Sequence, residues 1–229
     1  MNGVSFPLRV KGVTIDLDGT LLDTIPDLAV AANRMLDELG KPPLDVDVIR
    51  TFVGKGISRL VERTLAAGVN GAIDPELMQR ALAIFERRYT EVNGRHTTVY
   101  PGVQEGLTRL REQCFPLACV TNKSQRFTLP LLEMVDLARY FEHVVCGDTL
   151  ARKKPDPAPL LHACDALKIP PRDMLMIGDS VNDTEAARAA GCPVFCVTYG
   201  YNEGLDVRDL DSDALVDSLA DAVILIEKV

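Results

Sequence analysis

Apolar residues at alternating positions predict a buried β-strand near the start of the chain. Val13, Ile15 and Leu17 stand two residues apart, and Val10 extends the apolar run backwards. The pattern then changes. Over residues 26–39, apolar side chains recur at intervals of three and four, which is the spacing of an amphipathic helix. The first strand is therefore followed directly by helical sequence.

Helical periodicity continues through residues 25–95 without a strand pattern, and beyond them segments typical of strands and of helices alternate. The expected helices of the first part cover residues 26–39, a short stretch that Asp45 or Asp47 begins and that reaches Val53, residues 57–67 and residues 75–92, with a break at Gly54-Lys55-Gly56. The expected strands of the second part cover 116–120, 144–146, 174–177 and 194–197. Its expected helices cover residues 103–112 and 124–134. A further helix is expected to begin with Asp156 as N-cap and Pro157 as first helical residue, and another to end at Gly191. A last helix and strand are expected within residues 214–226.

Strands that alternate with helices imply a parallel, doubly wound sheet. The predicted fold is therefore α/β, with a Rossmann-like core made of residues 1–24 and 96–229. An all-helical domain, residues 25–95, is inserted after the first strand of that core. A chain of 229 residues, of which 47% are hydrophobic, is long enough and apolar enough for two such domains.

The charge and hydropathy of the chain limit the kinds of molecule that it is expected to bind. The net charge of −8 argues against nucleic acid as the main partner, although it leaves room for a small phosphorylated metabolite in a local basic pocket. No apolar run approaches the roughly 18 residues of a membrane span, and the first residues lack the apolar stretch of a signal peptide. We therefore expect a cytoplasmic protein without membrane contact, as a monomer or homodimer. The six cysteines are expected to be buried and reduced, and the three histidines structural.

Polar side chains follow three of the predicted strands. Because the carboxyl ends of parallel strands meet at one edge of a sheet, where ligands bind, we expect these side chains to lie together. They are Asp16 and Asp18 after the first strand, Thr121 and Asn122 after the second, and Asp179 and Asp183 after the strand at 174–177. Beside them, Gly19 permits a sharp turn and a close approach of the backbone to a ligand, and Thr20 offers a hydroxyl and backbone N–H groups.

These residue types suit phosphoryl transfer. Mg²⁺ prefers carboxylate oxygens and a substrate phosphate, and Asp16, Asp18 and Asp179 supply the carboxylates. A carboxylate also serves as a nucleophile that forms an aspartyl phosphate, while a second carboxylate moves the proton. The Thr121 hydroxyl and Lys154, in the loop RKKPDP, would hold the phosphate oxygens on which charge develops.

The segments DLDGT, VTN, KKPDP and GDSVND, in this order, resemble the four motifs of the haloacid dehalogenase superfamily, and the helical insertion resembles the C1-type cap of its phosphatases. The resemblance implies a division of roles. Asp16 would be the nucleophile and Asp18 the general acid and base, while Thr121 and Asn122 would bind phosphate and Lys154 would bridge nucleophile and phosphate. Mg²⁺ would be held by Asp16, the backbone carbonyl of Asp18 and Asp179, and Asp183 would orient Lys154 or a water molecule on the metal.

Four further segments, TIPDL, FVGKGISRL, VYPGV and VTYGYNEG, are similar to those of the bacterial phosphoglycolate phosphatases. This likeness implies the hydrolysis of 2-phosphoglycolate to glycolate and phosphate. Glu203 departs from that family's usual pattern, YGYN-Y-G. In the cap, Lys55 and Arg59 are the cations best placed to bind the substrate carboxylate, and Gly56 allows backbone N–H groups to turn inward.

Other functions fit parts of the pattern. A receiver domain of a signalling system also combines acidic residues, Mg²⁺ and a phosphorylated aspartate, but it carries no helical insertion directly after its first strand. A dehalogenase would not need the proton transfer that Asp18 offers. A phosphatase for another small sugar or metabolite phosphate, or a sugar-phosphate mutase, stays open as the alternative.

Overall fold

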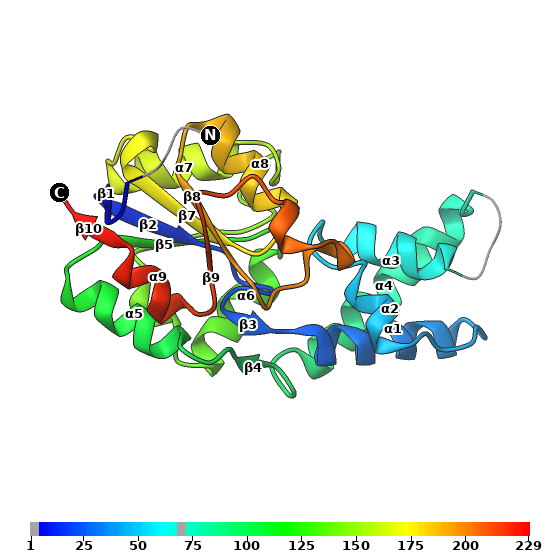
Figure 1. Ribbon diagram of the computed structural model, residues 1–229. Coiled ribbons are helices and arrows are strands. Elements are labelled where there is room, and N and C mark those ends of the chain that lie inside the picture. The colour runs from blue at the N-terminus through cyan, green and yellow to red at the C-terminus, as the bar shows by residue number, and fades with distance from the viewer. Residues whose placement is uncertain (1–4, 68–71) are drawn as a thin grey trace.

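The computed structural model describes residues 5–67 and 72–229. Residues 1–4 of the expected core and 68–71 of the expected helical domain lie outside this range. Figure 1 shows an α/β part and a helical part side by side, and the helical part is made of sequence near the N-terminus. The predicted α/β fold with an inserted helical domain is thereby confirmed.

The α/β part is built on a parallel sheet of six strands in the order β6-β5-β2-β7-β8-β9. The central strand β2 is buried along its whole length, as expected from the apolar pattern around Val13 and Ile15. The strands of this sheet are β2 (Gly12–Ile15), β5 (Leu117–Val120), β6 (His143–Val145), β7 (Met174–Gly178), β8 (Val194–Val197) and β9 (Ala214–Val216).

Helices cover both faces of this sheet, each with its own hydrophobic cluster. Side chains of α5, α6 and α9, such as Leu107, Leu131 and Leu219, pack in one cluster, and those of α7 and α8, such as Leu160 and Ala186, pack in another. The sheet is therefore doubly wound. The helices are α5 (Val103–Glu112), α6 (Gln125–Met134), α7 (Ala158–Leu167), α8 (Val181–Ala190) and α9 (Leu219–Ile224), with short 3₁₀ turns at Ala138–Tyr140, Pro171–Asp173, Asn202–Gly204 and Val207–Asp209.

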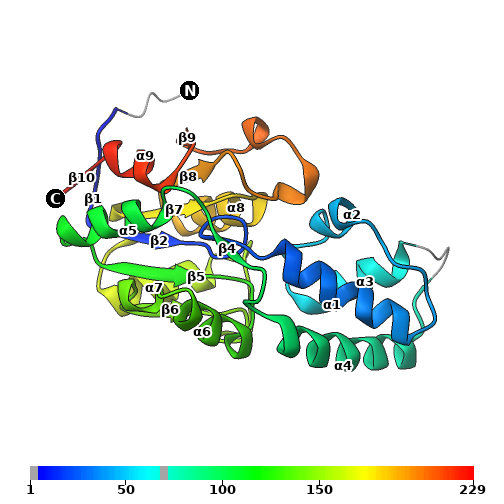
Figure 2. The ribbon, with the colours of Figure 1, turned by 90° about the horizontal axis from the view of Figure 1, so that it is seen from below.

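The inserted part consists of α1 (Ile25–Glu38), α2 (Val46–Arg50), α3 (Ile57–Ala66) and α4 (Pro75–Val92). Their apolar faces form a third hydrophobic cluster, which Phe127 and Tyr201 of the α/β part join. Local chemistry fixes the helix starts. The Asp74 carboxylate accepts a hydrogen bond from the Leu77 N–H at the start of α4, and Asp45 does the same for the Asp47 N–H at α2. Figure 2 shows this part beyond the ends toward which the strands point.

Several expected elements differ from the structure in detail. Val10 belongs to a separate strand, β1 (Leu8–Val10), which pairs with β10 (Ile226–Lys228), and the last segment runs strand, helix, strand. The N-cap of α7 is Pro157 and not Asp156, whose carboxylate instead accepts from the Ala158 N–H. Cys114 is exposed, because it lies in the turn after α5 with a positive φ, while the other five cysteines are buried.

Two short strands that periodicity did not indicate connect the two parts of the molecule. The strand β3 (Leu22–Asp23) pairs antiparallel with β4 (Thr98–Val99), so the chain enters and leaves the helical part at one place. The boundaries predicted at 24/25 and 95/96 fall beside this pair, and as domain boundaries they stay a prediction. Within the described residues, no helix combines the length and hydropathy that a membrane crossing requires.

A buried carboxylate ties these two connections together. Asp27, in the first turn of α1, is fully buried, and its oxygens accept hydrogen bonds from the backbone N–H groups of Gly94, His96 and Thr97 at 2.9–3.0 Å. The Thr97 hydroxyl donates to it at 2.7 Å, and the His96 ring nitrogen Nδ1 lies 2.9 Å away. One side chain therefore fixes the return of the chain from α4 against the start of α1.

Replacing Asp27 with Asn should destabilise the fold, because one oxygen that accepts hydrogen bonds becomes an NH₂ group facing N–H donors. Hydrogen bonds to a charged group contribute roughly 1.5–3 kcal/mol, so the melting temperature should fall by about 3–12 °C in calorimetry. The same substitution at Asp37, exposed on the same helix, should change stability by no more than about 0.5 kcal/mol. Equal effects at the two positions would contradict the assigned role of Asp27.

Candidate active site

The sheet brings together the polar residues that follow its central strands. In the ladder, Ile15 of β2 pairs with Cys119 of β5 and with Ile177 of β7, so the three strands end at one level. The side chains directly beyond these ends belong to Asp16, Thr121 and Asp179, and all three are buried. The sequence prediction that they meet at one edge of the sheet is confirmed.

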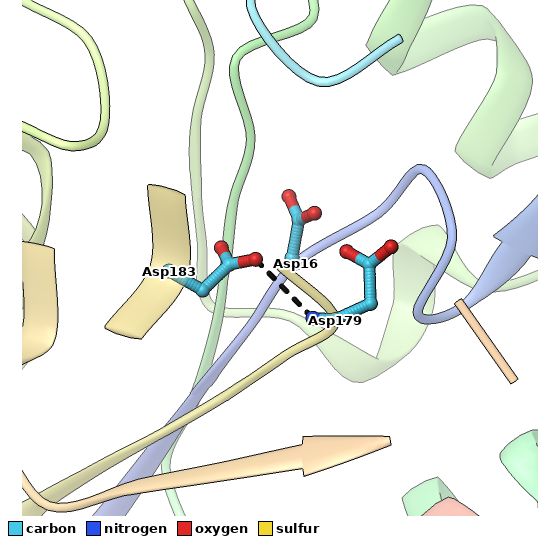
Figure 3. A group of neighbouring side chains, drawn as sticks. All are labelled: Asp16, Asp179 and Asp183. Carbon is cyan, nitrogen blue, oxygen red and sulfur yellow. Dashed lines mark hydrogen bonds between the residues drawn. The ribbon is translucent and has the colours of Figure 1, made fainter. Parts of the chain in front are cut away.

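Three aspartates form an acidic cluster. One carboxylate oxygen each from Asp16, Asp179 and Asp183 lies within 4.8 Å of the others, and Figure 3 shows the carboxylates of Asp16 and Asp179 pointing in the same direction. Burial raises the pKa of Asp16 to about 7, against the effect of Lys154, and burial together with the charges of Asp183 and Asp16 raises the pKa of Asp179. Oxygen donors held close together with too little positive charge fit a hard divalent cation.

Lys154 lies between two of these carboxylates. Its Nζ donates to Asp16 Oδ1 at 2.8 Å, to Asp183 Oδ1 at 2.6 Å and to the Val120 carbonyl at 2.7 Å, which uses all three of its N–H bonds. Burial alone would lower the pKa of this ammonium, but the charges of Asp16 and Asp183 raise it above the usual value. Lys154 is therefore a fixed cation next to Asp16.

Asp183 holds this lysine through one oxygen and the start of α8 through the other. Its Oδ2 accepts hydrogen bonds from the backbone N–H groups of Asp179 (3.2 Å) and Ser180 (3.1 Å) and from the Ser180 hydroxyl (2.9 Å). Both oxygens are thus occupied by protein donors. Asp183 is suited to position Lys154 and the Asp179 backbone.

Asp179 is held by groups on its other side. The Tyr201 N–H donates to Asp179 Oδ2 at 2.6 Å, and the Thr20 hydroxyl lies 3.5 Å from Oδ1. Two glycines leave room for the carboxylate: a Cβ on Gly19, whose φ is +90°, would lie 2.3 Å from Asp179 Oδ2, and one on Gly200 would lie 2.1 Å from Asp179 Cβ.

Gly19 and Thr20 therefore pack against the Asp179 side chain. Their backbone N–H groups bond to the carbonyls of Leu22 and Leu17 in the turn after β2. Neither residue lies on the lining of the pocket. The prediction that they bind substrate gains no support from this geometry.

Asp18 faces a lysine that the sequence analysis did not single out. Asp18 Oδ1 accepts from the Thr24 hydroxyl at 2.7 Å and from Lys123 Nζ at 3.1 Å, and Lys123 Nζ also donates to the Tyr89 hydroxyl of α4 at 2.6 Å. The Lys123 side chain is only 3% exposed. The available signal was its place in VTNK, directly after two strand-end residues assigned to phosphate.

The other strand-end residues after β5 have separate contacts. Thr121 is buried on the pocket lining, and its hydroxyl oxygen accepts from the Lys123 N–H at 3.1 Å, so its own O–H can donate to a ligand. Both side-chain N–H bonds of Asn122 are used, one to the Gly54 carbonyl and one to the Lys154 carbonyl, each at 2.8 Å. The Asn122 side chain thus joins two loops, and phosphate binding by it stays a prediction.

The helical part covers the site with the loop before α3 and with side chains of two helices, α3 and, through Leu28, α1. Gly54, Gly56, Ile57 and Leu60 lie on the pocket lining opposite the aspartates, and the cavity between the two parts measures about 40 Å³. The space that the two parts leave for a ligand is therefore small.

The two cap cations singled out in the sequence do not line this cavity. Lys55 forms an ion pair with Glu203 at 2.7 Å, and the half-exposed Arg59 pairs with Glu62 on its own helix. Glu203 also forms an ion pair with Arg63, at 2.7 Å. Partial burial of Glu203 would raise the pKa of its carboxyl, but its contacts with Lys55 and Arg63 lower that pKa below the usual value. Binding of substrate by Lys55 or Arg59 stays a prediction. Glu203, which departs from the usual pattern of the family, is the residue that pairs with Lys55.

Comparison with known proteins shows the family of this chain. A family model described as haloacid dehalogenase-like hydrolase matches residues 13–197, from β2 to β8. The chain belongs to this family.

Two curated relatives of this family member match over nearly their whole length. The phosphoglycolate phosphatase of Nitrosospira multiformis is 57% identical, and the match covers 97% of this chain and 98% of the relative. The phosphoglycolate phosphatase of Thiobacillus denitrificans is 51% identical, and the match covers 98% of this chain and 99% of the relative. The crystal structure of a predicted phosphoglycolate phosphatase from Haemophilus somnus superimposes with a TM-score of 0.88 at 32% identity, covering 93% of this chain and 96% of that one.

Replacing Gly200 with Ala should disturb the acidic cluster, because the new Cβ would overlap Asp179. Overpacking of this kind costs about 1–3 kcal/mol, so the affinity for Mg²⁺ in isothermal titration calorimetry should fall by about 5- to 150-fold if the strain is concentrated at Asp179. As a control, Gly40 has no atom within 4 Å of an added Cβ, and Gly40→Ala should leave the affinity unchanged. Unchanged Mg²⁺ affinity in the Gly200 variant would show that Asp179 does not need this close packing.

Proposed function

We propose that this haloacid dehalogenase-like hydrolase is a Mg²⁺-dependent phosphatase that converts 2-phosphoglycolate and water to glycolate and phosphate. The observation that carries the proposal is the pair of aspartates at the end of β2, each held in a different environment. Asp16 contacts Lys154 in the acidic cluster, and Asp18 contacts Thr24 and Lys123. The full-length relatives named phosphoglycolate phosphatase support the substrate.

The acidic cluster fits Mg²⁺, which would be held by Asp16 and Asp179, together with the Asp18 backbone carbonyl that the family resemblance implies. When bound, it would neutralise charge on the transferring phosphoryl group. The side chains of the site would carry out the bond changes.

In the first step, a carboxylate oxygen of Asp16 would attack phosphorus, and the bond from phosphorus to the ester oxygen would break. The Thr121 hydroxyl would donate to the phosphoryl oxygens, where negative charge increases, and Lys154 would stabilise that charge as a fixed cation beside Asp16. Asp18 would donate a proton to the leaving glycolate oxygen. Among the described residues its Oδ2 has no hydrogen-bond partner, so this oxygen would be the one that exchanges the proton.

In the second step, Asp18 would take a proton from a water molecule that attacks the phosphorus of the aspartyl phosphate. The bond between phosphorus and Asp16 then breaks, which releases phosphate and restores both carboxyl groups. The helical part, residues 25–95, would act as the cap that excludes other water while the intermediate exists. The small cavity supports a substrate of the size of phosphoglycolate.

Replacing Asp16 with Asn should reduce hydrolysis to background, because an amide is a poor nucleophile and a weaker metal ligand. The measurement is phosphate release from a panel of phosphorylated metabolites, with wild-type enzyme treated with chelator and then reloaded with Mg²⁺ as a second comparison. A near-normal rate in the variant would contradict the mechanism. A wild type that prefers a hexose phosphate, or that transfers phosphate between sugar hydroxyls, would contradict the substrate and favour a sugar phosphatase or mutase.

Replacing Asp18 with Asn should slow phosphoglycolate hydrolysis by about 10²–10⁴-fold, the usual contribution of general acid–base catalysis. Release of nitrophenol from p-nitrophenyl phosphate in the first turnover should suffer much less, because that leaving group needs little protonation. Rapid-quench measurements on both substrates would separate the two steps. Equal losses for the two leaving groups would indicate that Asp18 has only a structural role.

A further inference from the structure

Lys123, a cationic residue on the lining of the cavity, has no role in the proposed transfer of the phosphoryl group. Among the described residues that line it, the cationic side chains are Lys123 and Lys154. Lys154 has all three N–H bonds committed beside Asp16. Lys123 has two partners, Asp18 Oδ1 and the Tyr89 hydroxyl, so one of its three N–H bonds has no acceptor among the described residues.

We infer that Lys123 selects the substrate, because its ammonium group binds the carboxylate of the leaving group; this inference rests on the proposed function. A phosphate ester that also carries a carboxylate has two anionic ends. The phosphate end would lie near the fixed positive charge of Lys154, and the carboxylate would accept a hydrogen bond from Lys123. The residue thus determines specificity, and Asp16 and Asp18 perform the chemistry.

The length of phosphoglycolate agrees with the distance between Asp18 and Lys123. Asp18 must come within about 2.6–3.2 Å of the ester oxygen to protonate it. In phosphoglycolate, the carboxylate carbon lies two covalent bonds of roughly 1.5 Å from that oxygen. Lys123 Nζ is 3.1 Å from Asp18 Oδ1, so a carboxylate beside Asp18 comes within hydrogen-bond reach of the ammonium group.

The surroundings of Lys123 keep its ammonium group in place. The hydroxyl of Tyr89, from α4 of the helical part, accepts its hydrogen bond at 2.6 Å, and the Tyr89 side chain is fully buried. The lysine belongs to the α/β part, at the start of the segment that leads into α6. A carboxylate-bearing ligand would therefore contact a cation that both parts of the molecule position.

The cations of the cap are less suited to this task. Lys55 and Arg63 are already paired with the Glu203 carboxylate, and the Arg59 side chain is about half exposed and paired with Glu62. A buried ammonium group distinguishes an anionic from a neutral leaving group more strongly than these partly or half-exposed cations, whose charges are already paired and are screened by water and salt.

The test compares two substrates of similar size, 2-phosphoglycolate and 2-hydroxyethyl phosphate, in which a hydroxymethyl group replaces the carboxylate. In Lys123→Gln, the ratio of the two kcat/KM values should fall by about ten- to a hundredfold, mostly through KM for phosphoglycolate. Lys123→Arg, which keeps the charge, should restore a large part of the ratio. Arg126→Gln is the matched control, because Arg126 also links α6 to α4, through Glu86 and Thr90, but is exposed and lies off the cavity lining. Its ratio should equal that of the wild type.

A lysine that only positions Asp18 or supports the fold would reduce both kcat/KM values equally, and that result would overturn the inference while leaving the proposed function intact. A wild type without activity on phosphoglycolate would overturn the proposed substrate and the inference with it. If the variants fold poorly, inhibition of the wild type decides the question. The phosphonate 3-phosphonopropionate should then bind about tenfold or more tightly than propylphosphonate, and equal inhibition would overturn the inference.

Discussion

Three buried carboxylates share the carboxyl edge of the sheet, and the rest of the structure must compensate their mutual repulsion. Part of the compensation is Lys154, whose ammonium group touches Asp16 and Asp183. Another part is the start of α8, where backbone N–H groups face Asp183. Asp16 and Asp179 still keep raised pKa values because burial outweighs these contacts. A divalent cation would supply the missing charge, and this need links the fold to phosphoryl transfer.

The same edge of the sheet is connected to the helical part by a few buried polar contacts. The Tyr201 N–H holds Asp179, while the Tyr201 hydroxyl accepts from the Thr24 N–H at 2.7 Å, just before α1 begins. Asp27 fixes the returning chain, and Lys123 joins Asp18 to Tyr89. The residues that hold the acidic cluster and those that position the helical part thus share partners, so the position of the cap and the geometry of the site depend on each other.

Sequence patterns predicted what depends on local order. The alternation around Val13 and the helical period of 75–92 gave the sheet and the bounds of α4, and the strand-end rule placed Asp16, Thr121 and Asp179 together. Contacts between distant segments were not accessible in this way. The pairing of β1 with β10, the use of Asn122 to join two loops, and the capture of Lys55 by Glu203 all depend on tertiary contacts. The position of Lys123 in VTNK was a weak signal, and its contacts with Asp18 and Tyr89, which lie far away in the sequence, distinguish it from a surface lysine.

The central claim is that the substrate phosphoryl group passes through a covalent bond to Asp16. The most direct test is to quench the wild-type enzyme with acid during turnover of phosphoglycolate, reduce it with borohydride, and map its peptides by mass spectrometry. Borohydride reduces an acyl phosphate but not a free carboxylate, so the account predicts homoserine at position 16 only when substrate is present. Turnover with an unmodified Asp16, or substrate-dependent reduction at another aspartate, would contradict it.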